Sequence, residues 1–133
     1  MKGYIEILEK INGIKSIYRH ETESFMVINS DKDYEIEVDK DILLANKYDC
    51  ELVLIVSENI ENCIVNCLSV SRNVRALEFL DFLFEENGIA EGDGYIASGK
   101  MSKVIINVFI SQTEQSSSFH YFLQRAETYF KET

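Results

Sequence analysis

The chain has 133 residues, enough for one folded domain and too few for two comfortable ones, and 46% of the residues are hydrophobic against 27% charged. This composition is that of an ordinary globular protein and argues against global disorder. The formal net charge of −10, from 23 acidic and 13 basic residues, argues against direct binding to nucleic acid or to an anionic membrane, because phosphates would be repelled.

The first half of the chain predicts one helix followed by several strands. Residues 2–12 are expected to form a short helix, because apolar residues recur there at helical spacing and an Asn-Gly pair then gives a C-terminal capping signal. The stretch 42–45 fits either a short strand or a helical turn. Strands are expected, from β-branched and aromatic content and turn signals, at 14–20, 24–29, 33–38, 51–57 and 60–68.

A central helix is the clearest element of the sequence. Ser71 is a plausible N-cap, the residues from Val74 to Phe84 are mostly apolar, and Asn87-Gly88 closes the segment. Its narrow polar stripe consists of Arg75, Glu78, Asp81 and Glu85. A helix this apolar is covered on most of its circumference, which fits either a two-sided core or a homodimer interface.

The last third predicts a hairpin and a final helix. Strands 94–98 and 102–110 are expected to pair through a Gly99-Lys100 turn. Ser116 to Ser118 then offer an N-cap for a helix with a regular apolar stripe of Phe119, Phe122, Leu123, Ala126 and Phe130. We therefore expect a single α+β domain over residues 1–133, with a mainly antiparallel sheet of about six to eight strands, an N-terminal helix, a central amphipathic helix and a C-terminal helix.

Patterns that resemble catalytic or metal sites fail on inspection. Gly94 to Lys100 nearly matches a phosphate-binding loop, but Met101 stands where Ser or Thr should ligate magnesium, and a strand is expected where a helix should begin. The acidic start at Asp31 lacks the Gly and Glu of a calcium loop. No partner residues can be assigned to His20 or His120 from the sequence. We expect no enzyme activity, no cofactor and no metal.

The N-terminal segment and the cysteines indicate the cytoplasm. No uninterrupted apolar segment follows Met1, so we expect neither a signal peptide nor a membrane span. The three cysteines, Cys50, Cys63 and Cys67, are expected to be reduced and buried, because an odd number in a chain without an export signal argues against disulfides.

One acidic row departs from a plain globular pattern. Every odd position from 31 to 41 is acidic, and in a strand these side chains would share one face, spaced about 6.6–7 Å apart. Residues 21–61 hold a net charge of −9, from twelve acids and three bases. The predicted partner-binding residues are Glu21, Glu23, Asp31, Asp33, Glu35, Glu37, Asp39 and Asp41. The alternative is a solvated outer strand face that discourages aggregation.

In this acidic row and in its overall charge, the chain resembles bacterial immunity proteins that block nuclease toxins, including those of contact-dependent growth inhibition systems. The resemblance implies a small cytoplasmic protein that binds a basic toxin nuclease domain and occludes its nucleic-acid-binding or active site. The expected order of elements also resembles type III secretion chaperones, which implies as an alternative a homodimer that holds an effector segment.

Overall fold

The computed structural model describes residues 2–31 and 37–132. Its elements are β1 (Tyr4–Glu6), β2 (Ile14–His20), β3 (Phe25–Ser30), α1 (Val38–Lys47), β4 (Leu52–Glu58), β5 (Asn62–Ser69), α2 (Ala76–Phe84), β6 (Gly88–Gly92), β7 (Ile96–Ser102), α3 (Lys103–Thr113) and α4 (Ser118–Glu132). The described strands form one seven-stranded sheet in the order β1-β2-β3-β4-β5-β7-β6. Only β3 and β4 pair in parallel; the other described neighbours are antiparallel. The α+β class, the mainly antiparallel sheet and the expected number of strands are confirmed.

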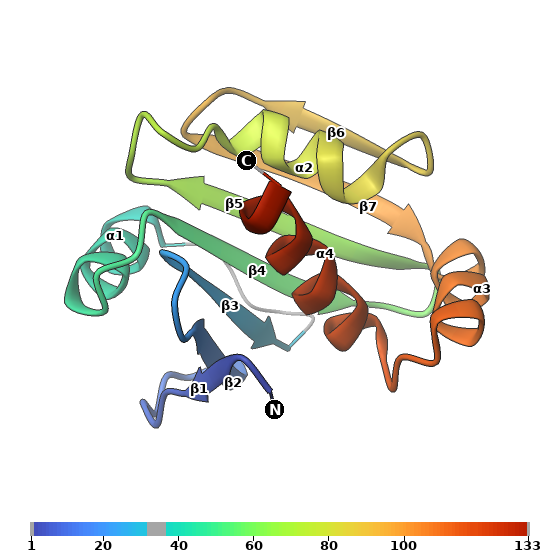
Figure 1. Ribbon diagram of the computed structural model, residues 1–133, viewed down its shortest axis with the longest axis horizontal. Helices are drawn as coiled ribbons and strands as arrows, with labels where there is room; N and C mark the ends of the chain where they lie inside the picture. The colour runs from blue at the N-terminus through green and yellow to red at the C-terminus, as the bar shows by residue number, and fades with distance from the viewer. Residues whose placement is uncertain (1, 32–36, 133) are drawn as a thin grey trace.

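One face of the sheet lies under α2 and α4 (Figure 1). Alternate strand residues point toward these helices, as the pleat of a strand requires, and among them Phe25 and Leu54 are fully buried. They meet Phe79 of α2 and Phe122 of α4 in the larger hydrophobic cluster of the protein. This cluster also explains why both helices are confirmed as predicted, since their apolar residues recur at the helical period and face the sheet.

The central and final helices keep the polar stripes that the sequence indicates. In α2, Glu78 and Asp81 are exposed while Phe79, Leu80 and Leu83 are buried. The helix begins at Ala76 rather than near Ser71, whose hydroxyl instead forms a hydrogen bond to Glu51. The apolar residues of α4 are buried in the predicted pattern at Phe119, Phe122, Leu123 and Ala126.

The other face of the sheet packs against α1 around β3 and β4. Met26, Ile28, Val53 and Ile55 alternate with the residues of the first face and form a second cluster, which includes Leu44 of α1. Residues 42–45, whose sequence fits either a short strand or a helical turn, therefore belong to the helix α1. The first turn of α1 carries acidic residues and its last turn a lysine, an arrangement that complements the helix dipole.

The N-terminal segment is a strand and a loop, not the helix predicted at 2–12. β1 pairs antiparallel with the end of β2. The hydroxyl of the buried Tyr4 donates a hydrogen bond of 2.5 Å to the carbonyl of Leu123, and its ring packs edge-on against Phe25. Ile5 and Leu8, which suggested a helix, are exposed. Tertiary contacts of Tyr4 therefore override the weak local periodicity.

The strand predicted at 102–110 is also wrong, because these residues form most of α3. Ser102 caps the helix by accepting a hydrogen bond from the backbone N–H of Val104, and Ile106 is buried. β-Branched residues lower helix propensity only slightly, so a good cap and a buried face suffice. The hairpin in this region is β6 with β7, and its turn begins at Asp93, whose carboxylate accepts two backbone N–H groups.

Candidate partner-binding surface

The acidic row predicted at 31–41 does not continue along one strand face. Asp33 and Glu35 lie outside the described residues, so the structure does not address their part of the row. Asp31 directly follows β3 and is exposed. Its backbone N–H donates a hydrogen bond to the carbonyl of Gly13, which fixes it at the end of the hairpin formed by β2 and β3.

From Glu37 onward the acidic residues belong to a helix. Successive helical residues are rotated by about 100°, so side chains two positions apart point in nearly opposite directions. Glu37 precedes α1 and lies 3.0 Å from the ammonium of Lys40. Asp39 is exposed, whereas Asp41 is only 2% exposed. The prediction of a shared strand face is therefore wrong for these three carboxylates, and Asp41 does not face solvent.

Glu21 and Glu23 lie in the loop between β2 and β3, at the opposite end of β3 from Asp31. β3 has six residues and separates the two ends by roughly 17–20 Å at about 3.3 Å per residue. The guanidinium of Arg19 donates hydrogen bonds to the carbonyls of Glu23 and Asp49, so two acid-bearing loops are held together. The structure thus places Asp31 and the loop with Glu21 and Glu23 at opposite ends of β3, and the role of the predicted residues in partner binding stays a prediction.

An exposed apolar patch lies where the turn between β4 and β5 meets α3. Ile60 at the tip of that turn is 94% exposed, Val104 is 75% exposed and Val108 is 50% exposed. Val104 and Val108 are one helical turn apart, so they share the outer side of α3. The turn and the start of α3 are neighbours, because the N–H of Lys103 donates to the carbonyl of Glu61, and exposed apolar side chains on neighbouring segments of a surface are a feature of interaction sites. We call this patch, with Glu58, Asn59, Glu61 and Lys103, the α3-end surface.

The geometry of the α3-end surface is fixed by local hydrogen bonds. The side-chain oxygen of Asn59 accepts hydrogen bonds from the backbone N–H groups of Glu61 and Asn62, at 2.9 and 2.8 Å. The N–H of Lys103 donates to the carbonyl of Glu61 at 2.9 Å. The turn and the start of α3 are therefore tied together, and Figure 1 shows the chain between β4 and β5 passing beside α3. Ile60 is presented on a defined loop.

Acidic groups flank the apolar patch. The carboxylate of Glu58 lies 3.6 Å from the ammonium of Lys103, and Glu61 is exposed. Together with Asn59 and Ile60, these residues line a surface cavity of about 590 Å³. An apolar centre with a polar, charged rim is the usual anatomy of a protein interface. The sequence does not reveal this surface, because 102–110, which forms most of α3, is expected to be a strand, and Ile60 is placed in a strand although it lies in the turn before β5.

The three cysteines and His20 are buried in the fold. Cys50, Cys63 and Cys67 are free and buried, and burial raises the pKa of Cys50 and of Cys63 to about 11. Nδ1 of His20 accepts the N–H groups of Thr22 and Glu23, while Nε2 lies 2.8 Å from a carboxylate oxygen of Glu127. These contacts hold the imidazole between the loop after β2 and α4.

Residues 2–31 and 37–132 hold neither a metal-binding group nor a membrane-spanning helix. Within these ranges no three His, Cys, Asp or Glu residues come together in a group that could hold a metal ion. None of the helices there is long and apolar enough to span a membrane. The segment from Gly94 to Lys100, which resembles a phosphate-binding loop, lies largely in β7, so its backbone pairs with neighbouring strands and does not form a phosphate cradle.

No protein-family model and no curated protein matches the chain. Among solved structures, part of the fold is similar to a pGpG-specific phosphodiesterase, PggH from Vibrio cholerae, with 12% identity and a TM-score of 0.41. The match covers 71% of this chain and 34% of the phosphodiesterase chain, about a third of its length. It contradicts the prediction from the sequence that this chain is not an enzyme, and that prediction is withdrawn. At this level of similarity the phosphodiesterase activity is not carried over to this chain.

Proposed function

We propose that this chain is a small cytoplasmic interaction protein that binds a basic protein partner through the α3-end surface. The observation that carries the proposal is the exposed apolar patch of Ile60, Val104 and Val108, flanked by the carboxylates of Glu58 and Glu61. Burial of such a patch against a partner would remove apolar area from water, which is the main favourable contribution to most protein association.

The charge of the chain selects the chemistry of the partner. A net charge of −10 repels other acidic proteins and speeds the approach of basic ones, because the summed field of the protein acts beyond individual contacts. Lys and Arg residues of the partner would pair with Glu58 and Glu61 at the rim. Such rim pairs add orientation and association rate more than they add affinity, and they are screened by salt.

A toxin nuclease domain is the kind of partner that we propose. Its Lys and Arg side chains hold nucleic-acid phosphates, so a protein that occupies them with carboxylates excludes the nucleic acid. This makes the chain an immunity protein, which neutralises its toxin by occlusion. The apolar patch would pack beside the occluded basic surface and slow dissociation of the complex.

The decisive experiment determines whether a gene adjacent to the gene of this chain encodes a basic, nuclease-like domain, and pairs this chain with that product. Binding is measured by calorimetry at low and high salt, and nuclease activity is measured with and without this chain. We expect Glu58→Lys with Glu61→Lys to weaken binding by roughly tenfold or more and to flatten its salt dependence. The matched control, Glu6→Lys with Glu132→Lys, makes the same charge change at two other exposed glutamates and should have a much smaller effect.

The apolar contribution is tested separately. Ile60→Ser should weaken binding by about 10- to 100-fold if Ile60 fills a pocket of the partner, whereas stability of the free chain should change little because the side chain is exposed. Equal effects of the site and control charge variants, together with no effect of Ile60→Ser, would show that the α3-end surface is not the binding site.

A further inference from the structure

The strand β6 forms one edge of the described sheet. It pairs with β7 along one side only, so the N–H and C=O groups of alternate residues are directed away from the sheet. Such an edge is a template for another extended chain. β6 spans five residues, Gly88–Gly92, whereas β1 at the other edge spans three. β6 therefore offers the longer template.

The edge is held rigidly by α2. The ring of Phe84 packs so closely over β6 and β7 that a Cβ atom added at Gly88 would lie 2.9 Å from its Cγ, and one added at Gly99 would lie 2.4 Å from its Cε2. The N-terminus of α2 is also tied to the hairpin turn, because the N–H groups of Ala76 and Leu77 donate to backbone carbonyls there. A rigid edge loses little conformational entropy when a strand is added.

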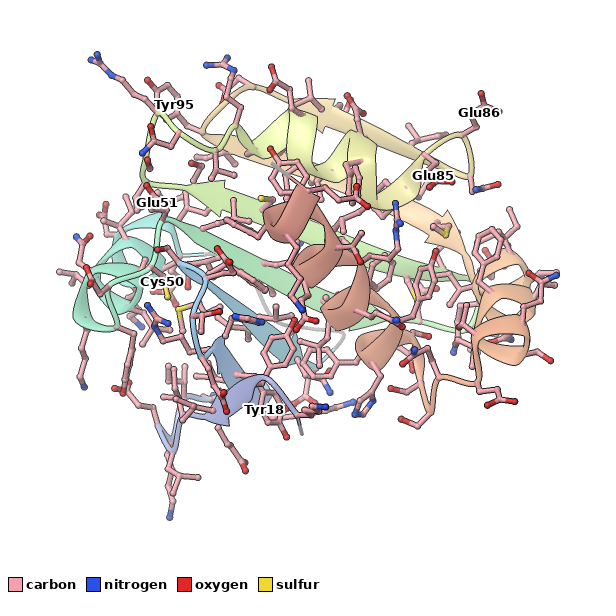
Figure 2. The ribbon with its side chains drawn as sticks, in the orientation of Figure 1. Tyr18, Cys50, Glu51, Glu85, Glu86 and Tyr95 are labelled. Carbon is pink, nitrogen blue, oxygen red and sulfur yellow. The ribbon has the colours of Figure 1, made fainter. Side chains whose placement is uncertain are left out.

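Acidic side chains stand at both ends of β6. Glu85 and Glu86 precede the strand, and Glu91 and Asp93 lie at its other end. Figure 2 shows Glu85 and Glu86 at one end of β6 and Tyr95 at the opposite end. The N–H groups of Ile96 and Tyr95 donate to the carboxylate of Asp93 and lower its pKa, so this carboxylate is ionised at neutral pH.

The open face beside the edge is partly apolar. Ile89 is 69% exposed, and Ile96 on the neighbouring strand is 43% exposed. Both side chains point to the face opposite α2. The residue that follows each of them, Ala90 on β6 and Ala97 on β7, packs into the cluster under that helix. The same face carries Glu91, Ser98 and Lys100, and Ile89 pairs with Lys100, so every second side chain of an added strand would lie beside Ile89 and Glu91.

We propose that the β6 edge binds an extended basic segment of a partner protein by strand addition, in the manner of other edge-recognition modes. The inference rests on the proposed function, since it assigns a second contact with the same basic partner. Backbone pairing supplies affinity, and Lys or Arg side chains near the ends of the added strand meet Glu86 at one end and Glu91 at the other. Glu85 is already paired with Arg125, and the carboxylate of Asp93 accepts two backbone N–H groups. A second copy of this chain does not fit the edge, because two β6 strands would bring acidic residues against acidic residues.

The test uses a synthetic peptide, acetyl-Lys-Val-Lys-Val-Lys-Val-Lys-amide, and nuclear magnetic resonance of the full chain. We expect saturable binding with shifted and exchange-protected amides in Gly88–Gly92, and roughly tenfold weaker binding for Glu86→Lys with Glu91→Lys. The control Glu6→Lys with Glu132→Lys should also weaken peptide binding, but by less than half of the binding free energy lost in Glu86→Lys with Glu91→Lys. Thermal unfolding of each variant verifies that it is folded.

Two results would overturn the inference. One is peptide binding that leaves the β6 amides unchanged. The other is binding of the basic partner that is lost in Glu58→Lys with Glu61→Lys but is unaffected by Glu86→Lys with Glu91→Lys; in that case the proposed function stands and the β6 edge is not part of the interface. Peptide binding at β6 in a chain that binds no basic partner protein would refute the proposed function and leave the edge as a strand-addition site.

Discussion

Replacement of Gly99 by alanine tests the close packing that holds the β6 edge. A Cβ atom at Gly99 would lie 2.4 Å from Cε2 of Phe84 and 2.6 Å from the backbone carbonyl oxygen of Ile89. The ring can tilt, but the carbonyl oxygen belongs to the strand paired with β7 and moves only if the sheet moves. Gly99→Ala should therefore strain the contact between α2 and the β6–β7 hairpin.

The magnitude follows from two opposing contributions. Overpacking a well-filled core costs about 1–3 kcal/mol, and loss of the backbone freedom of glycine in the unfolded chain returns about 0.4–1 kcal/mol. We expect a net loss of about 1–2 kcal/mol in the free energy of unfolding. For a chain of 133 residues this lowers Tm by roughly 4–7 °C.

Urea unfolding followed by circular dichroism measures this change directly. Ser98→Ala is the matched control, because Ser98 is the preceding residue of β7 and points to the open face; its effect should stay within about 0.5 kcal/mol. Gly99→Ala should cost less in a Phe84→Leu background than in the unaltered chain, since the smaller side chain relieves one of the two contacts. An unchanged or raised stability of Gly99→Ala would refute the described packing.

Three further predictions concern stability and reactivity. Glu114 ends α3 with φ of 57°, so Glu114→Gly should raise stability by about 0.5–1 kcal/mol in thermal unfolding, and Glu114→Val should lower it. Because burial raises the pKa of Cys50, Cys63 and Cys67, a thiol reagent at pH 8 should react slowly with the folded chain and rapidly in denaturant; fast reaction of the folded chain would contradict this. The pKa of the Asp93 carboxyl is lowered, so the ionised carboxylate stabilises the fold above about pH 4, and this stabilisation is lost as the pH falls through the folded-state pKa. Asp93→Asn should therefore reduce the change in the free energy of unfolding, measured with urea, between pH 6 and pH 3. An unaltered pH dependence would contradict this role of Asp93.

The helices α2 and α4 could be predicted because their periodicity is decided locally and their buried faces follow it. Phe119, Phe122 and Leu123 recur at the helical spacing and are all buried. The segment 2–12 shows the opposite case. Ile5 and Leu8 have helical spacing but are exposed, and the contacts that decide the structure come from Tyr4, whose partners lie far along the chain. Such long-range partners cannot be read from local sequence.

The candidate surface could not be predicted for a related reason. Exposed apolar residues such as Ile60 and Val104 look like core residues in a sequence, because exposure depends on which neighbours the fold supplies. The acidic residues of the row alternate with other residues, and this period of two is typical of a strand. From Val38 onward the chain is a helix, in which the side chains of Asp39 and Asp41 point in different directions. The charge of the chain was visible in the sequence, but its position on the surface was not.

The parallel pairing of β3 with β4 has a consequence for how the chain folds. The strands β1–β3 and β4–β7 each form an antiparallel unit. The pairs β1–β2, β2–β3, β4–β5 and β6–β7 join neighbours in sequence, and such local hairpins form quickly, whereas β5 pairs with β7 across α2 and β6. In the sheet the units join where β3 pairs with β4, and α4 bridges them through the hydrogen bond from Tyr4 to Leu123 and the stacked rings of Phe25 and Phe130. Both contacts join segments more than a hundred residues apart, so docking of the two units should be the slow step in refolding.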